Sequence, residues 1–160
     1  AEGCTYGSPA ASGRGESPVG ASGIVLMALP ARLARYQSLL AAIPGLGLPV
    51  EPDWARSNWQ SFCIRLPDGC DQRQVMQSLL DAGVATRRGI MCSHREAAYP
   101  RGTWSCGVEP GACECVSGSC QRLQQSEDAQ DRTIILPLFP QMSFEQQDQV
   151  VAALHGALRA

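Results

Sequence analysis

The spacing of hydrophobic positions along this 160-residue chain predicts helices and strands in a mixed order. Apolar residues recur at steps of three and four between Ala31 and Ile43, which is typical of one face of an amphipathic helix, and Pro44-Gly45 ends the pattern. From Trp59 to Leu66 the spacing changes to alternation, and this period indicates a strand. One side holds Trp59, Ser61, Cys63 and Arg65, and the other holds Gln60, Phe62, Ile64 and Leu66. The first half of the chain is therefore expected to form a helix followed by a strand.

A second helix is predicted from Asp71, which has the character of an N-cap residue with Gln74 three positions later, to the helix-stopping Gly83. Its expected core face holds Val75, Met76, Leu79 and Leu80. Val84-Ala85-Thr86 follows directly, and we interpret it as a short returning strand.

The last part of the chain again shows a strand pattern and a helix pattern. Thr133-Ile134-Ile135-Leu136 is a short apolar strand, and Ser143 with Gln146 forms a capping box at the start of a final helix. That helix is expected to bury Phe144, Gln147, Val150, Val151, Leu154 and Leu158. The pattern predicts an α+β fold, in which helices cover one face of a small, mostly antiparallel sheet.

Two stretches depart from this regular patterning. Residues 1–23 consist mainly of Gly, Ser, Ala and Pro, so we expect them to be disordered, and we assign residues 24–160 to one domain. Residues 100–125 are rich in cysteine and have only weak periodicity, which predicts a long loop insertion.

Composition narrows the possible functions. A formal net charge of −2 argues against a nucleic-acid partner, because such proteins carry a clustered basic excess. No apolar run approaches the ~20 residues that a membrane helix needs. Ile24–Leu29 is short, internal and without a basic flank, so it does not resemble a signal peptide, and we expect a cytoplasmic protein with reduced thiols.

Three stretches, at residues 57–62, 81–99 and 126–142, resemble one family in their order and spacing. They include Gly83-Val84-Ala85-Thr86-Arg87-Arg88-Gly89, then His94-Arg95-Glu96-Ala97-Ala98-Tyr99, then Ile134-Ile135-Leu136-Pro137-Leu138-Phe139-Pro140-Gln141-Met142. Together they are similar to the C-terminal small domain of the DegT/DnrJ/EryC1/StrS sugar aminotransferases, which have the fold type I architecture.

The resemblance implies an enzyme that uses pyridoxal phosphate (PLP) to aminate a nucleotide-linked keto-sugar, commonly as a homodimer. In that family a large domain holds PLP through a lysine, whereas all 13 basic residues of this chain are arginine. We therefore expect no catalytic residue in this chain, no PLP binding by it alone, and no activity without the missing large domain or a complementary chain.

The resemblance also suggests three substrate-binding residues. Arg87 and Arg88 occupy a loop that faces the active site in the family, where paired guanidinium groups suit a diphosphate. His94 occupies the turn histidine of the family and could donate to a phosphate or a sugar hydroxyl. The alternatives are a solvated arginine pair and a structural histidine.

Two other functions stay open. Cys106, Cys113, Cys115 and Cys120 could bind a metal, but their C-x6-C-x-C-x4-C spacing lacks the CxxC pairs of most structural zinc sites, so we assign no metal site. The alternatives are an insertion without function and a sequence altered by a frameshift. The chain could also be a non-catalytic interaction or dimerisation module derived from the small domain.

Overall fold

The computed structural model describes residues 20–100, 104 and 119–159, with the backbone only for 20–28. Its elements are α1 (Gly20–Leu40), β1 (Phe62–Arg65), α2 (Gln72–Asp81), β2 (Arg87–Arg88), α3 (Gln124–Arg132), β3 (Thr133–Leu136) and α4 (Phe144–Ala157), with short 3-10 turns η1 (Ser93–Arg95) and η2 (Gln121–Leu123). Within these residues, no helix is long and apolar enough to cross a membrane.

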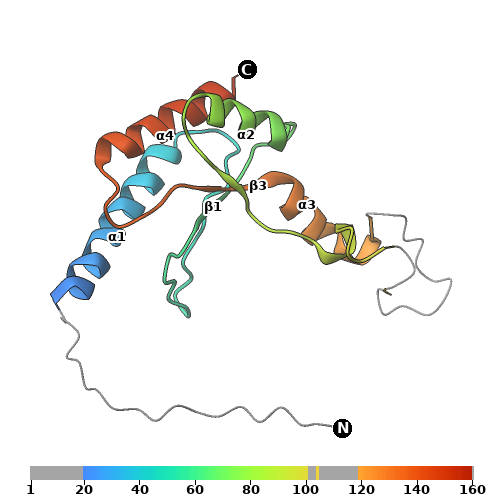
Figure 1. Ribbon diagram of the computed structural model, residues 1–160, viewed down its shortest axis with the longest axis horizontal. Coiled ribbons are helices and arrows are strands. Elements are labelled where there is room, and N and C mark those ends of the chain that lie inside the picture. The colour runs from blue at the N-terminus through green and yellow to red at the C-terminus, as the bar shows by residue number, and fades with distance from the viewer. Residues whose placement is uncertain (1–19, 101–103, 105–118, 160) are drawn as a thin grey trace, which may run out of the picture.

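The three strands form one antiparallel sheet in the order β1-β3-β2. Phe62 pairs with Leu136 and Ile64 with Ile134, so these four side chains share one face, and all are buried. Helices α1, α2 and α4 lie together on that side of the strands (Figure 1). The predicted α+β fold, with helices on one face of a small antiparallel sheet, is confirmed.

The core lies between this sheet face and the three helices. Tyr36 of α1 lies against Phe62 with ring centroids 5.1 Å apart, and its hydroxyl donates to the Pro137 carbonyl oxygen over 2.9 Å. The other fully buried side chains include Leu40, Ile64, Leu66, Leu79, Ile134, Leu136, Met142 and Leu154. Apolar burial of this extent is the main favourable term in folding.

Several predicted boundaries agree with the structure. Strand β3 spans the predicted residues, and Ser143 forms the expected capping box with Gln146 at the start of α4. Asp71 caps α2 by accepting from the amides of Arg73 and Gln74.

Other boundaries were wrong, each for a local reason. Strand β1 begins at Phe62 instead of Trp59, because Trp59 adopts a left-handed φ of 51° that a strand does not allow. The return strand is Arg87–Arg88 instead of 84–86, because the Val84 amide is used to close α2, donating to the Leu79 carbonyl.

Two side chains predicted to be in the core are exposed. Leu80 is 56% exposed and Phe144 is 49% exposed, with the Arg35 guanidinium 4.9 Å from the Phe144 ring centroid. Both flank their helix's buried stripe, which is narrower than the sequence suggested. Residues 1–19 of the N-terminal segment lie outside the described residues, and α1 begins at Gly20, inside the segment that we expected to be disordered.

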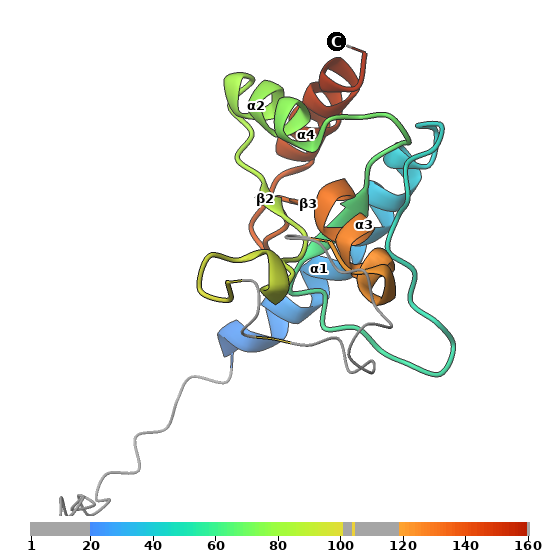
Figure 2. The same cartoon turned by 90° about the vertical axis from the view of Figure 1, so that its right-hand side faces the viewer.

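Helix α3 was not predicted at all. It begins at residue 124, within the expected loop, and its buried residues are Glu127 and Gln130. Because the buried side of α3 is polar, a search for hydrophobic periodicity has nothing to detect. Turned by 90°, the structure shows α2 and α4 together at one end and α3 beside the strands (Figure 2).

Candidate functional site

The segment that follows β2 leads from the sheet into the candidate site. Gly89 continues the pairing of β2 with β3 by one residue and donates its amide to the Thr133 carbonyl over 2.9 Å. A Cβ on Gly89 would lie 2.7 Å from Thr133 Cβ and 2.6 Å from Cys63 Sγ. Only glycine fits at this position, because any side chain would collide with Thr133 and Cys63. The close contact fixes where residues 90–96 begin.

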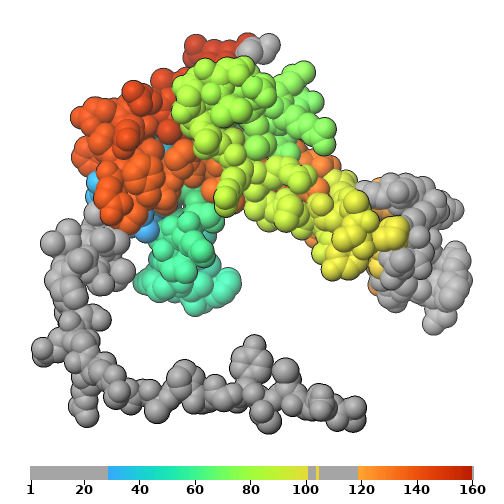
Figure 3. Space-filling view, viewed as in Figure 1, coloured from blue at the N-terminus to red at the C-terminus, as the bar shows by residue number. Residues whose placement is uncertain are grey.

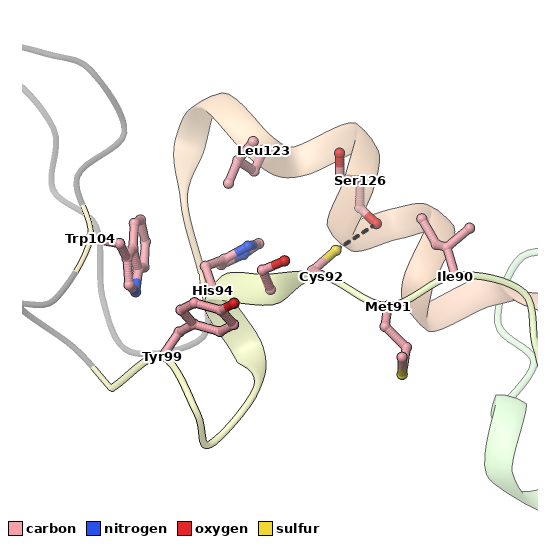
Figure 4. A pocket seen from close by; sticks show the side chains of 9 residues that line it. Ile90, Met91, Cys92, His94, Tyr99, Trp104, Leu123 and Ser126 are labelled. Atoms are coloured by element: carbon pink, nitrogen blue, oxygen red, sulfur yellow. Dashed lines mark hydrogen bonds between the residues drawn. The ribbon is translucent and has the colours of Figure 1, made fainter. Parts of the chain in front are cut away.

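Beyond Gly89 this path borders a cavity of about 470 Å³. Residues 90–94 form one wall, Tyr99 and Trp104 another, and Leu123 and Ser126 close it from the side of α3 (Figure 4). The His94 and Trp104 rings meet edge to face, 5.3 Å between centroids. A cavity of this size with aromatic and apolar walls has the properties of a small-molecule site.

The cavity wall is held in place by one buried carboxylate, Glu127 of α3. It accepts hydrogen bonds from His94 Nε2 over 2.8 Å, the Cys120 amide over 2.5 Å and Ser119 Oγ over 3.3 Å, and Arg95 lies 3.4 Å away. We call these five residues the Glu127 cluster. It joins three separate segments: η1, residues 119–120 and α3.

The environment of Glu127 favours its charged form. Burial raises the pKa of this carboxyl, but the hydrogen bonds from His94 and the Cys120 amide lower it, as does the charge of Arg95. The net effect is a pKa below the ordinary value for Glu. Glu127 is therefore a fixed negative charge next to the cavity.

Polar contacts also fix Cys92, which forms part of the wall. Its amide donates to Gln130 Oε1 over 2.8 Å, and its thiol donates to the Ser126 carbonyl over 3.2 Å (Figure 4). Burial raises the pKa of the Cys92 thiol. A protonated, buried thiol is a poor nucleophile, so Cys92 has a structural role.

Of the three residues expected to bind substrate, only His94 lines this cavity. His94 has a side chain that is 6% exposed, and its Nε2 is occupied by Glu127, which agrees with the structural alternative. Its imidazole nevertheless lines the cavity.

Arg87 and Arg88 are both exposed, and they leave the strand on opposite faces. Arg87 is in register with Ile135, and Arg88 with the buried Ile134. Successive strand residues point to opposite sides of a sheet. The two side chains therefore leave the strand in opposite directions, and the expected binding of one diphosphate by both stays a prediction.

Of the four loop cysteines, only Cys120 falls among the described residues, where it is a buried free thiol. Cys106, Cys113 and Cys115 lie outside them. In the part of the chain that the structure describes, no three His, Cys, Asp or Glu side chains are grouped to hold a metal ion. The metal alternative for the loop stays a prediction, which metal analysis of protein prepared without chelator would test.

Sequence reasoning missed the Glu127 cluster. Ser126-Glu127 was noted only as part of the family resemblance, and nothing in the local pattern connects Glu127 with His94, 33 residues away. The available signal was the run of helix-favouring Gln, Glu and Ala at 124–130, next to a short strand.

PLP does not fit the residues of this chain. The cofactor is held covalently by a lysine amine, and none of the 160 residues is a lysine. The residues of the cavity offer no amine that could replace it.

Known proteins share sequence with most of this chain. Residues 30–155 match the DegT/DnrJ/EryC1/StrS aminotransferase family. The chain is 31% identical over 121 residues to the erythromycin biosynthesis sensory transduction protein EryC1 of Saccharopolyspora erythraea, which covers 74% of this chain and 28% of EryC1.

Solved structures share the fold. DesV from S. venezuelae has a TM-score of 0.62 and 25% identity, covering 84% of this chain and 32% of DesV. Spr1654 from Streptococcus pneumoniae, solved in its PLP form, has a TM-score of 0.62 and 16% identity, covering 84% of this chain and 31% of Spr1654. The chain thus spans about a third or less of these relatives. By its match over residues 30–155, this chain belongs to the DegT/DnrJ/EryC1/StrS aminotransferase family.

Proposed function

We propose that this chain is the small-domain part of a PLP-dependent aminotransferase that acts on a nucleotide-linked keto-sugar, and that the 160 residues alone do not transaminate. The observation that carries the proposal is the family match over residues 30–155, in a chain that spans 28% of EryC1 and contains no lysine. The lysine and the cofactor site then belong to a large domain, on the same or another polypeptide, within a homodimer.

The shape of the chain supports a role as a lid. The loop at 47–61 and the segment that carries η1 and α3 both project away from α1, α2 and α4 (Figure 1). Between them the surface is hollowed on the side away from those helices (Figure 3). We propose that this hollowed side faces the large domain.

Within this lid, Arg87 is the arginine that suits the substrate. It lies on the sheet face shared with Cys63 and Ile135, opposite the helices, and in the described part of the chain its side chain has no acidic partner. An exposed guanidinium there can bind a phosphate of the substrate. His94 then contributes one wall of the neighbouring cavity.

Reaction with PLP tests the lysine argument. The purified 160-residue chain is incubated with PLP, reduced with borohydride and weighed by intact-mass spectrometry. We expect stoichiometric addition of cofactor at no site other than the α-amino group of the first residue, because the chain has no lysine amine, and peptide mapping locates the label. A lysine-containing protein treated in parallel is the positive control, and stoichiometric labelling of this chain at an internal residue would contradict the proposal.

A second candidate function is a non-catalytic interaction module. It is favoured by two apolar side chains on the projecting loop, Trp54 at 87% and Val50 at 82% exposure. Large exposed apolar groups often mark a contact surface. Light scattering after size-exclusion chromatography tests this candidate: a dimer that Trp54→Ser dissociates favours the module, whereas a monomer counts against it.

A further inference from the structure

The separation of Arg87 from Arg88 places Arg88 in a different surface groove, on the side of the sheet that carries the helices. Arg88 is in register with Ile134, whose side chain is buried under those helices. Next to it lies α2, and the two elements enclose a cavity of about 430 Å³. This cavity is separate from the one beside His94.

Two arginines share this groove without a carboxylate. Arg73 of α2 and Arg88 of β2 both line it. Elsewhere in the described residues, Arg35, Arg65 and Arg132 each pair with an aspartate. Neither Arg73 nor Arg88 has such a partner among the described residues, so their like charges stay uncompensated.

The other side chains that line the groove do not neutralise the charges of Arg73 and Arg88. None of its lining residues is acidic. Of the two aspartates nearby, Asp71 caps α2, and Asp81 lies outside the lining and accepts from Nε2 of the groove residue Gln77 over 2.8 Å. Thr86 adds a hydroxyl to the lining.

An apolar wall completes the groove. Leu80, 56% exposed, and Met76 lie on the same side of α2 as Arg73. A leucine this exposed beside two arginines favours a ligand that combines an oxyanion with a small apolar body. Arginine is the side chain best suited to phosphate, which it binds through paired N–H donors.

We propose that Arg73 and Arg88 form a binding site for a phosphate monoester, with the phosphate between the two guanidinium groups and the organic part against Leu80 and Met76. We call it the Arg73/Arg88 groove. It is a second anion site, on the opposite side of the sheet from Arg87, and it requires neither PLP nor the large domain.

Arg122 of η2, which is exposed and does not line the groove, supplies a matched control for the test. Phenyl phosphate and inorganic phosphate are titrated separately into the isotopically labelled 160-residue chain at constant ionic strength, and amide chemical shifts are followed by NMR. We expect saturable shifts at Thr86 and Gln77. Arg88→Gln and Arg73→Gln should each weaken phenyl phosphate binding about tenfold, whereas Arg122→Gln, with the same loss of charge on η2, should change it less than about twofold.

The apolar wall is tested with Leu80→Asn. This variant should weaken phenyl phosphate and leave inorganic phosphate unchanged, which distinguishes an ester site from a simple phosphate site. Equal effects of Arg122→Gln and Arg88→Gln would reveal nonspecific charge attraction and overturn the proposal. So would shifts that do not saturate, or an unchanged affinity for phenyl phosphate in Leu80→Asn. Both arginines are exposed, so the variants should fold, and unchanged spectra away from α2 and β2 check this.

Discussion

Two regions of this molecule are built by different forces. Between the sheet and helices α1, α2 and α4, side chains such as Phe62, Leu79 and Leu154 are fully buried. Around α3, the buried groups are Glu127 and Gln130, and directional hydrogen bonds hold the segments together. The first region is stabilised by the burial of apolar surface, and the second by hydrogen bonds to the charged carboxylate of Glu127.

The difference affects how each region responds to change. An apolar core loses stability in proportion to the volume removed from it. A buried polar cluster depends on every partner at once, because removing one leaves the others unsatisfied. The Glu127 cluster should therefore be sensitive to substitutions that hardly change volume.

The largest effect is expected in the apolar core. Phe62→Ala should lower the free energy of unfolding by about 4 kcal/mol, because it leaves a cavity beside Tyr36. Phe144→Ala, which removes the same ring from a position that is 49% exposed, should cost less than about 1 kcal/mol. Urea denaturation measures both. Similar losses for the two variants would mean that this sheet face is not the core.

The next effect concerns the Glu127 cluster. Glu127→Ala should cost about 3 kcal/mol, because it leaves His94, Arg95 and the Cys120 amide without their acceptor. Asp131→Ala is the matched control, since Asp131 also pairs with Arg95 but is 59% exposed, and it should cost less than about 1 kcal/mol.

Amide hydrogen exchange shows which elements lose stability in each variant. Amides of η1 and α3 should lose protection in Glu127→Ala, while those of α4 keep it. If α4 loses protection to the same extent, the two regions unfold as one, and the contrast between them fails.

The smallest effect is a dependence on pH. The pKa of Glu127 is lower in the folded chain than in the unfolded chain, so the folded state holds its proton less tightly. Its contribution to stability is present above the unfolded value of about 4.3 and is lost as the pH falls through the lower folded pKa. Urea denaturation between pH 6 and pH 3 should show this loss in the natural chain.

The isosteric variant Glu127→Gln isolates that contribution. It keeps the shape of the side chain but cannot ionise, so its stability should fall less steeply over the same acidic range. Parallel curves for the two proteins would show that another carboxyl group causes the acid sensitivity.

The sequence predicted the apolar region well and the polar region poorly, and particular residues show why. Ile134 and Leu136 belong to a strand whose alternation marks its buried face, and Ser143 marks the start of α4 through chemistry within four residues. Helix α3 has no apolar face, so its existence depends on partners such as His94 that come from another segment. Leu80 was wrongly assigned to the core, because hydrophobic periodicity shows which face of a helix is buried but not how wide the buried face is.

The candidate site was predicted only in part. The resemblance drew attention to Arg87, Arg88 and His94, but it did not show that β2 would direct the two arginines to opposite faces. Nor could it show that a buried carboxylate would occupy His94 Nε2.

The sequence by itself determined the helix-covered sheet, the capping residues and the absence of lysine, because periodicity, local hydrogen bonding and composition are properties of the chain alone. Only the tertiary structure decided the face on which each arginine lies and the joining of η1, residues 119–120 and α3 around Glu127. These depend on strand register and on contacts between residues far apart in the chain, which no local pattern encodes.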